Sequence, residues 1–273
     1  MENLEITGGD EAADSGGGIY IYNASGVVTL TAVLQNLKVT NNSARSAGGI
    51  SSSLSNPSSR MTIENSTISD NTADYGGGLS VNEGGAGTII SSSTISGNTA
   101  TYQGGGLYQI ASRFRLSNST VSGNSAPTGG GIYYRAVATS YISSSTITKN
   151  SGYGIYAVTG IADFIYVHDS IIAGNIGNND CYALYSILVS HGYNLVGNVD
   201  GDNFGGGPTT GDQFGSRASG TIVHPFLSTL GYYGGRIETH RLKLGSPAID
   251  AGDPAGCTDA DGVLLTPVVW RSG

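Results

Sequence analysis

Short stretches in which hydrophobic and polar residues alternate run through most of this chain. Residues 61–64, 66–69 and 78–81 are three such stretches within one segment. In a β-strand, successive side chains face opposite sides. The aliphatic residues of all three stretches can therefore face one narrow core while Thr and Ser face outward. Gly, Asn and Ser separate the stretches, which is typical of tight corners between short strands.

This segment recurs along the chain, and each copy is called a coil here. An asparagine closes a small polar turn in every coil, at intervals that shorten from 29 to 23 residues. The asparagines are Asn42, Asn71, Asn98, Asn124, Asn150, Asn175 and Asn198. A period of this length indicates a solenoid. With three short strands per coil, the pattern predicts an all-β, right-handed parallel β-helix of about seven to eight coils, followed by an irregular C-terminal module.

Composition and charge narrow the possible functions. The chain has 44 glycines, 12 % charged residues and a net charge of −8. An acidic chain lacks the counterion release that dominates nucleic-acid binding, so nucleic acid is excluded as a partner. No apolar run approaches the ~18 residues of a membrane-spanning helix, so no transmembrane segment is expected.

The recurring asparagine has two interpretations. Asn tolerates the left-handed backbone region, and equivalent side chains can stack as a structural ladder along a solenoid. Alternatively, the row could supply polar ligands for a sugar or an ion. Because the residue recurs in every coil whatever its neighbours, the structural ladder is favoured.

The repeats resemble the β-helix repeats of secreted and surface-anchored bacterial proteins, and are similar to the short Gly-Gly-aliphatic repeats of polymorphic outer-membrane proteins. Residues 193–198, 234–240 and 244–253 resemble the choice-of-anchor Q module. The stretch 266–271 departs from that module, because its usual Asp-Gln-Arg-Gly block is absent. The resemblance implies an exported, extracellular or cell-surface protein, and it does not imply a catalytic activity.

Three regions follow from the repeats and the resemblance. Residues 1–198 are expected to form the coils, 199–224 a Gly/Asp-rich excursion loop, and 225–273 the C-terminal module. The sequence contains neither a signal peptide nor the anchor. Residues 4–9 align with later strands, so we expect either a fragment of a longer precursor or a first coil that is left bare. Bare strand edges favour association, which predicts a homo-oligomer or filament through the end coils.

Cysteine and aspartate residues offer two further kinds of site. Cys181 and Cys257 fit a disulfide that joins the C-terminal module to the last coil, and they fit two buried thiols equally well. Oxygen ligands for Ca²⁺ are spaced at alternate positions in two places, Asp200 with Asp202 and Asp259 with Asp261. Neither place has the complete ligand pattern of a calcium loop. No cofactor is expected, with Ca²⁺ as the alternative.

One acid–base cluster stands out in the regular repeats, formed by Asp163, His168 and Asp169. Glycoside hydrolysis needs two carboxylates on one face, about 5–5.5 or 6.5–9.5 Å apart. The aligned coils give no such acidic pair at equivalent positions. The cluster is therefore interpreted as a surface strand and corner, with catalysis as the alternative.

A row of tyrosines follows the inward aliphatic residue of the glycine-cluster strand, at Tyr20, Tyr108, Tyr133 and Tyr156. The row has three interpretations: the high β propensity of Tyr alone, a partner contact, or stacking on sugar rings.

These features predict a non-catalytic extracellular or cell-surface structural protein, adhesin-like or self-assembling end to end, with a cell-surface glycan or protein as the other possible partner. The alternative is a carbohydrate-active enzyme, a polysaccharide lyase or hydrolase, or a glycan-binding module that uses the outer face.

Overall fold

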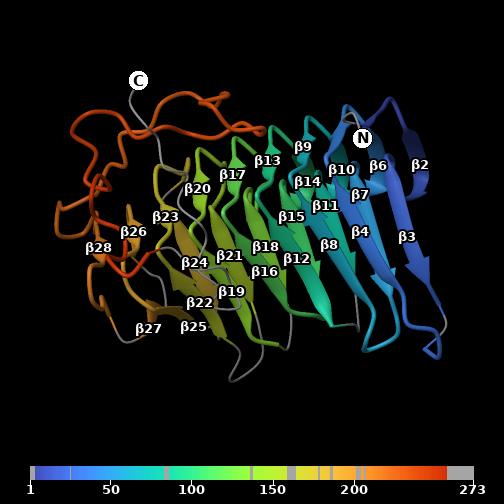
Figure 1. Ribbon diagram of the computed structural model, residues 1–273, viewed down its shortest axis with the longest axis horizontal. Helices are drawn as coiled ribbons and strands as arrows, with labels where there is room; N and C mark the ends of the chain where they lie inside the picture. The colour runs from blue at the N-terminus through green and yellow to red at the C-terminus, as the bar shows by residue number, and fades with distance from the viewer. Residues whose placement is uncertain are drawn as a thin grey trace.

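The chain folds into a parallel β-solenoid (Figure 1). The structure is a computed structural model, and it describes residues 4–24, 26–82, 86–135, 138–158, 164–177, 179–184, 187–200, 204–205 and 207–256. Within these ranges the secondary structure consists of strands, with no helix. The described residues accordingly include no helix that is long and apolar enough to cross a membrane.

The strands form four sheets, named A to D here, and every strand pairing within them is parallel. Sheet A contains β1 (Leu4–Thr7), β5 (Leu37–Thr40), β9 (Thr67–Ser69), β13 (Thr94–Ser96), β17 (Thr120–Ser122), β20 (Thr146–Thr148), β23 (Ile171–Ile172), β26 (Leu195–Val196) and β28 (Gln213–Phe214). Sheet B contains β2 (Asp10–Ser15), β6 (Ser43–Ser46), β10 (Thr72–Tyr75) and β14 (Thr99–Gln103).

Sheets C and D complete the walls of the rod. Sheet C contains β3 (Ile19–Asn23), β7 (Ile50–Leu54), β11 (Leu79–Asn82), β15 (Leu107–Ile110), β18 (Ile132–Arg135), β21 (Ile155–Val158) and β24 (Cys181–Leu184). Sheet D contains β4 (Thr31–Gln35), β8 (Arg60–Glu64), β12 (Gly87–Ser91), β16 (Phe114–Ser117), β19 (Ser140–Ser143), β22 (Phe164–His168), β25 (Ile187–Ser190) and β27 (Phe204–Gly205).

The first coils run through sheets D, A, B and C in turn, and the later coils run through D, A and C, so the predicted all-β solenoid is confirmed. In the described residues, six coils carry strands of D, A and C together, from β4 to β24, fewer than the seven to eight expected. The count falls because, among the residues that the structure describes, no sheet C strand follows the repeat that ends at Asn198. Sheet B adds a short fourth strand to the first coils, and isolated bridges at Ser125, Ser151 and Ile176 continue it.

Hydrophobic alternation places the core as expected. Ile63 of sheet D, Ile68 of sheet A, and Leu79 and Val81 of sheet C are all fully buried. Neighbouring coils repeat these positions in register, since Ile63 pairs with Ile90 and Ile68 pairs with Ile95. The core is therefore a continuous apolar column along the rod, which each additional coil lengthens.

Glycine is required where neighbouring coils approach closely. A Cβ atom at Gly105 would lie 2.5 Å from the carbonyl oxygen of Gly130 and 2.6 Å from the amide nitrogen of Ser125. Both atoms belong to the backbone of the next coil, so a side chain here would force the coils apart.

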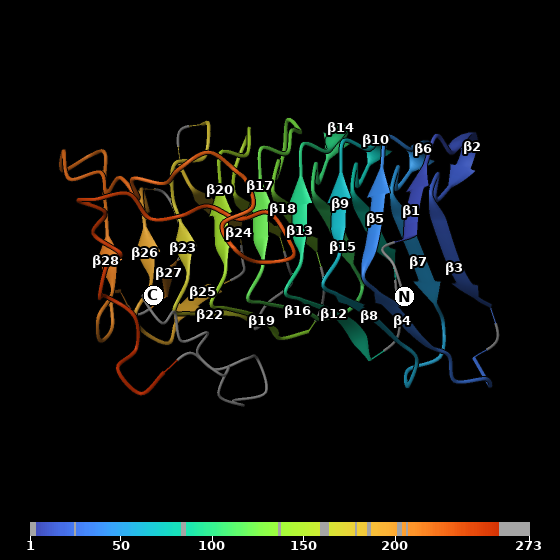
Figure 2. The ribbon, with the colours of Figure 1, turned by 45° about the horizontal axis from the view of Figure 1, so that its top comes forward.

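The C-terminal residues 225–256, called the C-terminal strap here, turn back along the rod and lie over sheet A (Figure 2). Antiparallel bridges hold the strap together at Leu227–Leu242 and Gly231–Thr239. The preceding residues 199–224, expected to be an excursion loop, include β27 and β28, which extend sheets D and A. The strap covers the middle of sheet A and leaves sheet C as an open face.

Candidate functional site

Six of the seven asparagines form a buried ladder. In each of the five steps the Oδ1 atom accepts hydrogen bonds from both the backbone and the side-chain nitrogen of the preceding asparagine, as Asn98 does from Asn71 at 3.0 and 2.9 Å. The members are Asn42, Asn71, Asn98, Asn124, Asn150 and Asn175. Their polar atoms are occupied by one another and by backbone carbonyls, so the ladder serves the fold.

Asn198, expected as the seventh member, lies outside the ladder. Its Oδ1 accepts from the backbone nitrogen of Arg217 at 3.0 Å, and its Nδ2 donates to Asn179 at 3.1 Å. Asp180 takes the final ladder position instead, because its Oδ1 accepts from both nitrogens of Asn175.

A second ladder runs parallel to the first and was not anticipated from the sequence. The backbone nitrogen of each member donates to the side-chain oxygen of the next, at 2.9 to 3.2 Å. The members are Ser66, Ser93, Ser119, Ser145, Ser170 and Asn194, with Asp212 as the last acceptor. The signal was a serine directly before each of five consecutive sheet A strands, from β9 to β23, at the same period as the asparagines.

The tyrosine row lies on the outer face of sheet C. Tyr108 pairs in register with Tyr133, which pairs with Tyr156, and Tyr182 of β24 continues the row. The rings stack with centroids 5.2, 5.8 and 4.7 Å apart and interplanar angles of 10° to 19°. Tyr182 was missed in the sequence because no glycine cluster precedes it.

Stacking buries part of this row. Tyr133, between two rings, is only 6 % exposed. Burial and the neighbouring phenols raise the pKa of Tyr108 and of Tyr156 above the ordinary value. Tyr108 and Tyr156 therefore present neutral phenol groups, and the row as a whole offers apolar faces and hydroxyl groups that can donate or accept.

Two serines interrupt the row and open a slot. Along sheet C the equivalent positions read Tyr20, Ser51, Ser80 and Tyr108. Since neighbouring strands are about 4.8 Å apart, Tyr20 and Tyr108 are roughly 14 Å apart along the rod, and two rings are missing between them. Tyr75 of sheet B reaches over to Tyr108, with ring centroids 5.5 Å apart, and forms part of one wall.

The slot has a volume of about 270 Å³. Its floor and walls combine tyrosine rings with small polar side chains, and no charged side chain of the described residues lines it. The lining residues are Ser15, Tyr20, Ser46, Ser51, Ser52, Ser53, Tyr75, Ser80, Asn82, Tyr108 and Ile110. Aromatic walls with a hydroxyl floor suit a neutral ligand that has both apolar faces and hydroxyl groups.

The acid–base cluster faces the C-terminal strap. His168 Nε2 lies 3.4 Å from the Asp253 carboxylate, and the Asp169 carboxylate accepts from the backbone nitrogen of Asp253 at 3.3 Å. Asp169 also takes the corner position with φ of 49°. Asp163 lies outside the described residues. His168 and Asp169 thus contact the docked strap. Asp169 also lines a cavity of about 110 Å³ beside the strap, and no second carboxylate of the described residues lines it.

The remaining expected sites are only partly described. Asp200 accepts from the Ser216 hydroxyl and from the backbone nitrogen of Ala218, contacts that lower its pKa. Cys181 is fully buried on β24. Cys257, Asp202, Asp259 and Asp261 lie outside the described residues. Within the described residues, no three His, Cys, Asp or Glu side chains gather as a metal site would require.

Comparison with known proteins identifies the class that the repeats define. The family described as "Right handed beta helix region" matches residues 1–162 and, in a second overlapping match, 54–224. The chain belongs to this family. No curated protein and no solved structure matches the chain.

Proposed function

We propose that this protein is a non-catalytic, surface-associated β-helix, adhesin-like in its role, that binds a neutral carbohydrate chain in the slot of sheet C. The observation that carries the proposal is the uncharged slot between Tyr20 and Tyr108 with Ser51 and Ser80 on its floor. A sugar ring has apolar C–H faces and a rim of hydroxyl groups. Aromatic rings can cover the faces, and serine hydroxyl groups can pair with the rim.

The slot supports binding more directly than it supports catalysis. A glycosidase needs an acid and a second carboxylate close to the bond that breaks, and the described lining of the slot has neither. His168 and Asp169, from the acid–base cluster that the sequence singled out, contact the C-terminal strap instead. Rigid tyrosine walls on a paired sheet are suited to holding a ligand without reshaping it.

A glycan array probed with the labelled protein, followed by calorimetry on the best oligosaccharide, tests the proposal. Ser51→Tyr should fill the slot with an aromatic ring. Sheet C accepts a tyrosine at this position, since Tyr133 occupies the equivalent place on β18. We expect this variant to fold and to lose binding. Thr62→Tyr, an outward position on sheet D, is the matched control and should bind normally. Undiminished binding by Ser51→Tyr would rule out the slot.

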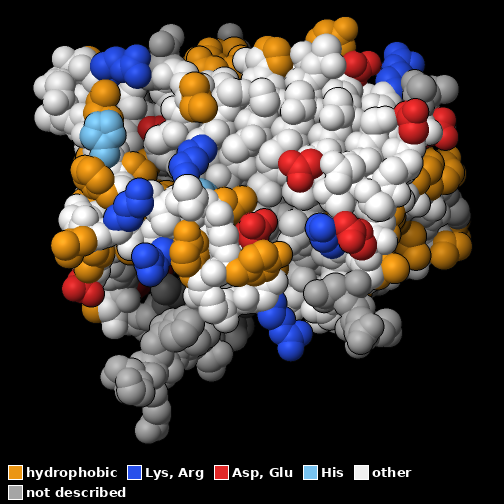
Figure 3. Space-filling model, turned by 90° about the horizontal axis from the view of Figure 1, so that it is seen from above, with side chains coloured by type: hydrophobic (Ala, Val, Ile, Leu, Met, Phe, Trp, Pro, Cys, Tyr) orange, Lys and Arg blue, Asp and Glu red, His pale blue; other side chains and the backbone are white. Residues whose placement is uncertain are grey.

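End-to-end association is a second candidate function, favoured by apolar side chains near the first coil. Leu4 is 59 % exposed and Val27 is 88 % exposed, and hydrophobic side chains gather at the N-terminal end of the rod (Figure 3). Ile6 packs against the core in β1. Ile6→Asp should abolish larger species in light scattering while the later coils stay folded. Unchanged assembly in this variant would contradict the proposal.

A further inference from the structure

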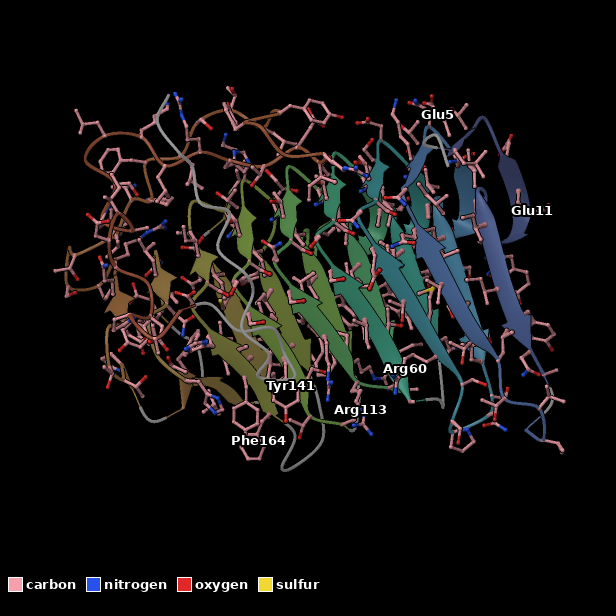
Figure 4. All side chains as sticks on the ribbon, viewed as in Figure 1. Glu5, Glu11, Arg60, Arg113, Tyr141 and Phe164 are labelled. Atoms are coloured by element: carbon pink, nitrogen blue, oxygen red, sulfur yellow. The ribbon has the colours of Figure 1, made fainter. Side chains whose placement is uncertain are left out.

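Arg60 and Arg113 flank a glycine on the outer face of sheet D. Arg60 of β8 pairs in register with Gly87 of β12. Arg113, directly before β16, lies on the other side, since a Cβ atom at Gly87 would be 2.5 Å from its Cγ atom. Figure 4 shows Arg60 and Arg113 along the same edge of the solenoid. The stem of Arg113 packs over Gly87, where a larger residue would clash with it. A small hollow opens between the side chains of Arg60 and Arg113, which come from different coils.

A third arginine borders the same hollow. Arg115 pairs with Ile89, two residues beyond Gly87, so it projects from the same face of sheet D. Its guanidinium lies 5.6 Å from the ring centre of Tyr141 in the next coil. Such a cation–π contact positions the group. The hollow has a volume of about 50 Å³, and its lining residues are Arg60, Ala86, Gly87, Thr88, Ile89, Arg113 and Arg115.

The electrostatics of the hollow contrast with those of the whole chain. The net charge is −8, yet no carboxylate of the described residues lines this hollow. Three guanidinium groups stay protonated at any physiological pH. The three positive charges repel one another, and an anion placed between them is attracted to each of them. The hollow therefore favours an anionic ligand.

We propose that this arginine hollow binds a tetrahedral oxyanion, the phosphate or sulfate group of a small ligand. Guanidinium groups donate paired hydrogen bonds to the oxygens of such groups. The three arginines, which lie on the two sides of β12, can each take a different oxygen, whereas a planar carboxylate offers only two. The volume exceeds the ~10–15 Å³ that one water needs, so a larger group has room to enter. The site is separate from the slot of sheet C and stands whether or not the slot binds carbohydrate.

Titration of the whole chain with inorganic phosphate and inorganic sulfate at low ionic strength, followed by calorimetry, tests this site. Arg60→Gln and Arg113→Gln should each weaken binding roughly tenfold, the factor expected when one charge-assisted hydrogen-bonded pair is lost. Arg45→Gln removes the same charge from an exposed position on β6 and should leave binding unchanged. Phenyl phosphate and phenyl sulfate, compared in the same way, show which ester the hollow prefers.

Two results would overturn the proposal: no binding of either anion by the unaltered chain, or equal weakening by Arg45→Gln, which would show a general charge effect. Thermal unfolding checks that each variant is folded. If Arg60→Gln does not fold, Arg60→Lys replaces it, because lysine keeps the charge but lacks the forked donor. Weakened binding in Arg60→Lys would support the site, and unweakened binding would count against the forked contact.

Discussion

The side-chain nitrogen of Asn175 donates to the carboxylate of Asp180 at 2.9 Å, and its backbone nitrogen donates to the same oxygen at 2.8 Å. This geometry repeats the asparagine-to-asparagine contact of every earlier coil, with an acid as the last acceptor. The serine ladder ends in the same way, on Asp212. Each ladder thus ends on an aspartate, whose side chain accepts hydrogen bonds from the last ladder residue and has no further ladder residue to bind.

Ionisation of Asp180 should lower stability. Burial raises the pKa of this carboxyl above its ordinary value, although the hydrogen bonds from Asn175 oppose the shift. The folded protein therefore favours the protonated carboxyl. Its contribution to the unfolding free energy is complete below the pKa of the unfolded state and is lost as pH rises through the pKa of the folded state. Asp180→Asn keeps an acceptor oxygen and removes the charge, so its unfolding free energy should depend less on pH. Denaturant unfolding across the acid-to-neutral range measures this.

Asp74→Asn, at a half-buried position of β10, is the control for Asp180→Asn and should keep the pH dependence of the original chain. If Asp180→Asn were destabilised at neutral pH but not in acid, the ionised carboxylate would be the stabilising form.

Removal of one ladder residue should cost about 2–4 kcal/mol of unfolding free energy, since several buried groups lose their partners. In Asn98→Ala, both nitrogens of Asn71 lose their acceptor, and the carbonyl of Ile68 loses its donor. Chemical denaturation measures the change. Thr99→Ala, at the adjacent exposed position, should change stability by no more than ~0.5 kcal/mol. Similar losses in both variants would mean that the ladder adds no special stability.

Docking of the C-terminal strap should weaken in mild acid because of His240. Its Nδ1 lies 2.9 Å from the Ser228 carbonyl oxygen and its Nε2 lies 2.8 Å from the Ser122 hydroxyl. Nδ1–H donates to the carbonyl, so Nε2 accepts from the hydroxyl in the neutral ring. Burial, the largest cause, lowers the pKa of His240 below its ordinary value. Its contribution is therefore complete above the unfolded pKa and is lost as pH falls through the folded pKa.

Hydrogen exchange of residues 225–256 at several pH values would follow this loss. His240→Gln should reduce the pH dependence that the strap shows, whereas His224→Gln, at an exposed position, should keep it. Equal protection of the strap at mildly acid and neutral pH in the unaltered chain would contradict this role for His240.

Tyr108 and Tyr156 occupy equivalent positions in the same stack, but only Tyr108 lines the slot. Tyr108→Ala should therefore weaken carbohydrate binding by about 1 kcal/mol, roughly fivefold. Tyr156→Ala removes an equivalent ring outside the slot and should bind as the original chain does. Calorimetry with the oligosaccharide found on the array compares the two. Equal losses would show that the whole row binds, and not the slot.

The core and the tyrosine row could be predicted because both follow directly from strand alternation. Ile63 and Ile68 face inward, and Tyr133 faces outward, as the period of two requires. The coil count was too high because Asn198 matches the repeat in sequence while its side chain takes different partners. Single-residue signals of this kind do not show whether a further strand follows.

The slot and the hollow depend on contacts that no single coil contains. The interruption at Ser51 and Ser80 is visible in the sequence, but one wall needs Tyr75 to reach across from another sheet. The hollow requires the register that places Arg60 beside Gly87. The strap has irregular backbone and no period, so nothing in its sequence indicates that it turns back over sheet A.

The central claim is that the slot of sheet C binds carbohydrate, and hydrogen exchange with and without a saturating oligosaccharide tests it most directly. The account predicts added protection in β7, β11 and β15, the sheet C strands that contribute Ser51, Ser80 and Tyr108 to the slot. Protection confined to other parts of the chain, or no protection despite measured binding, would contradict the claim.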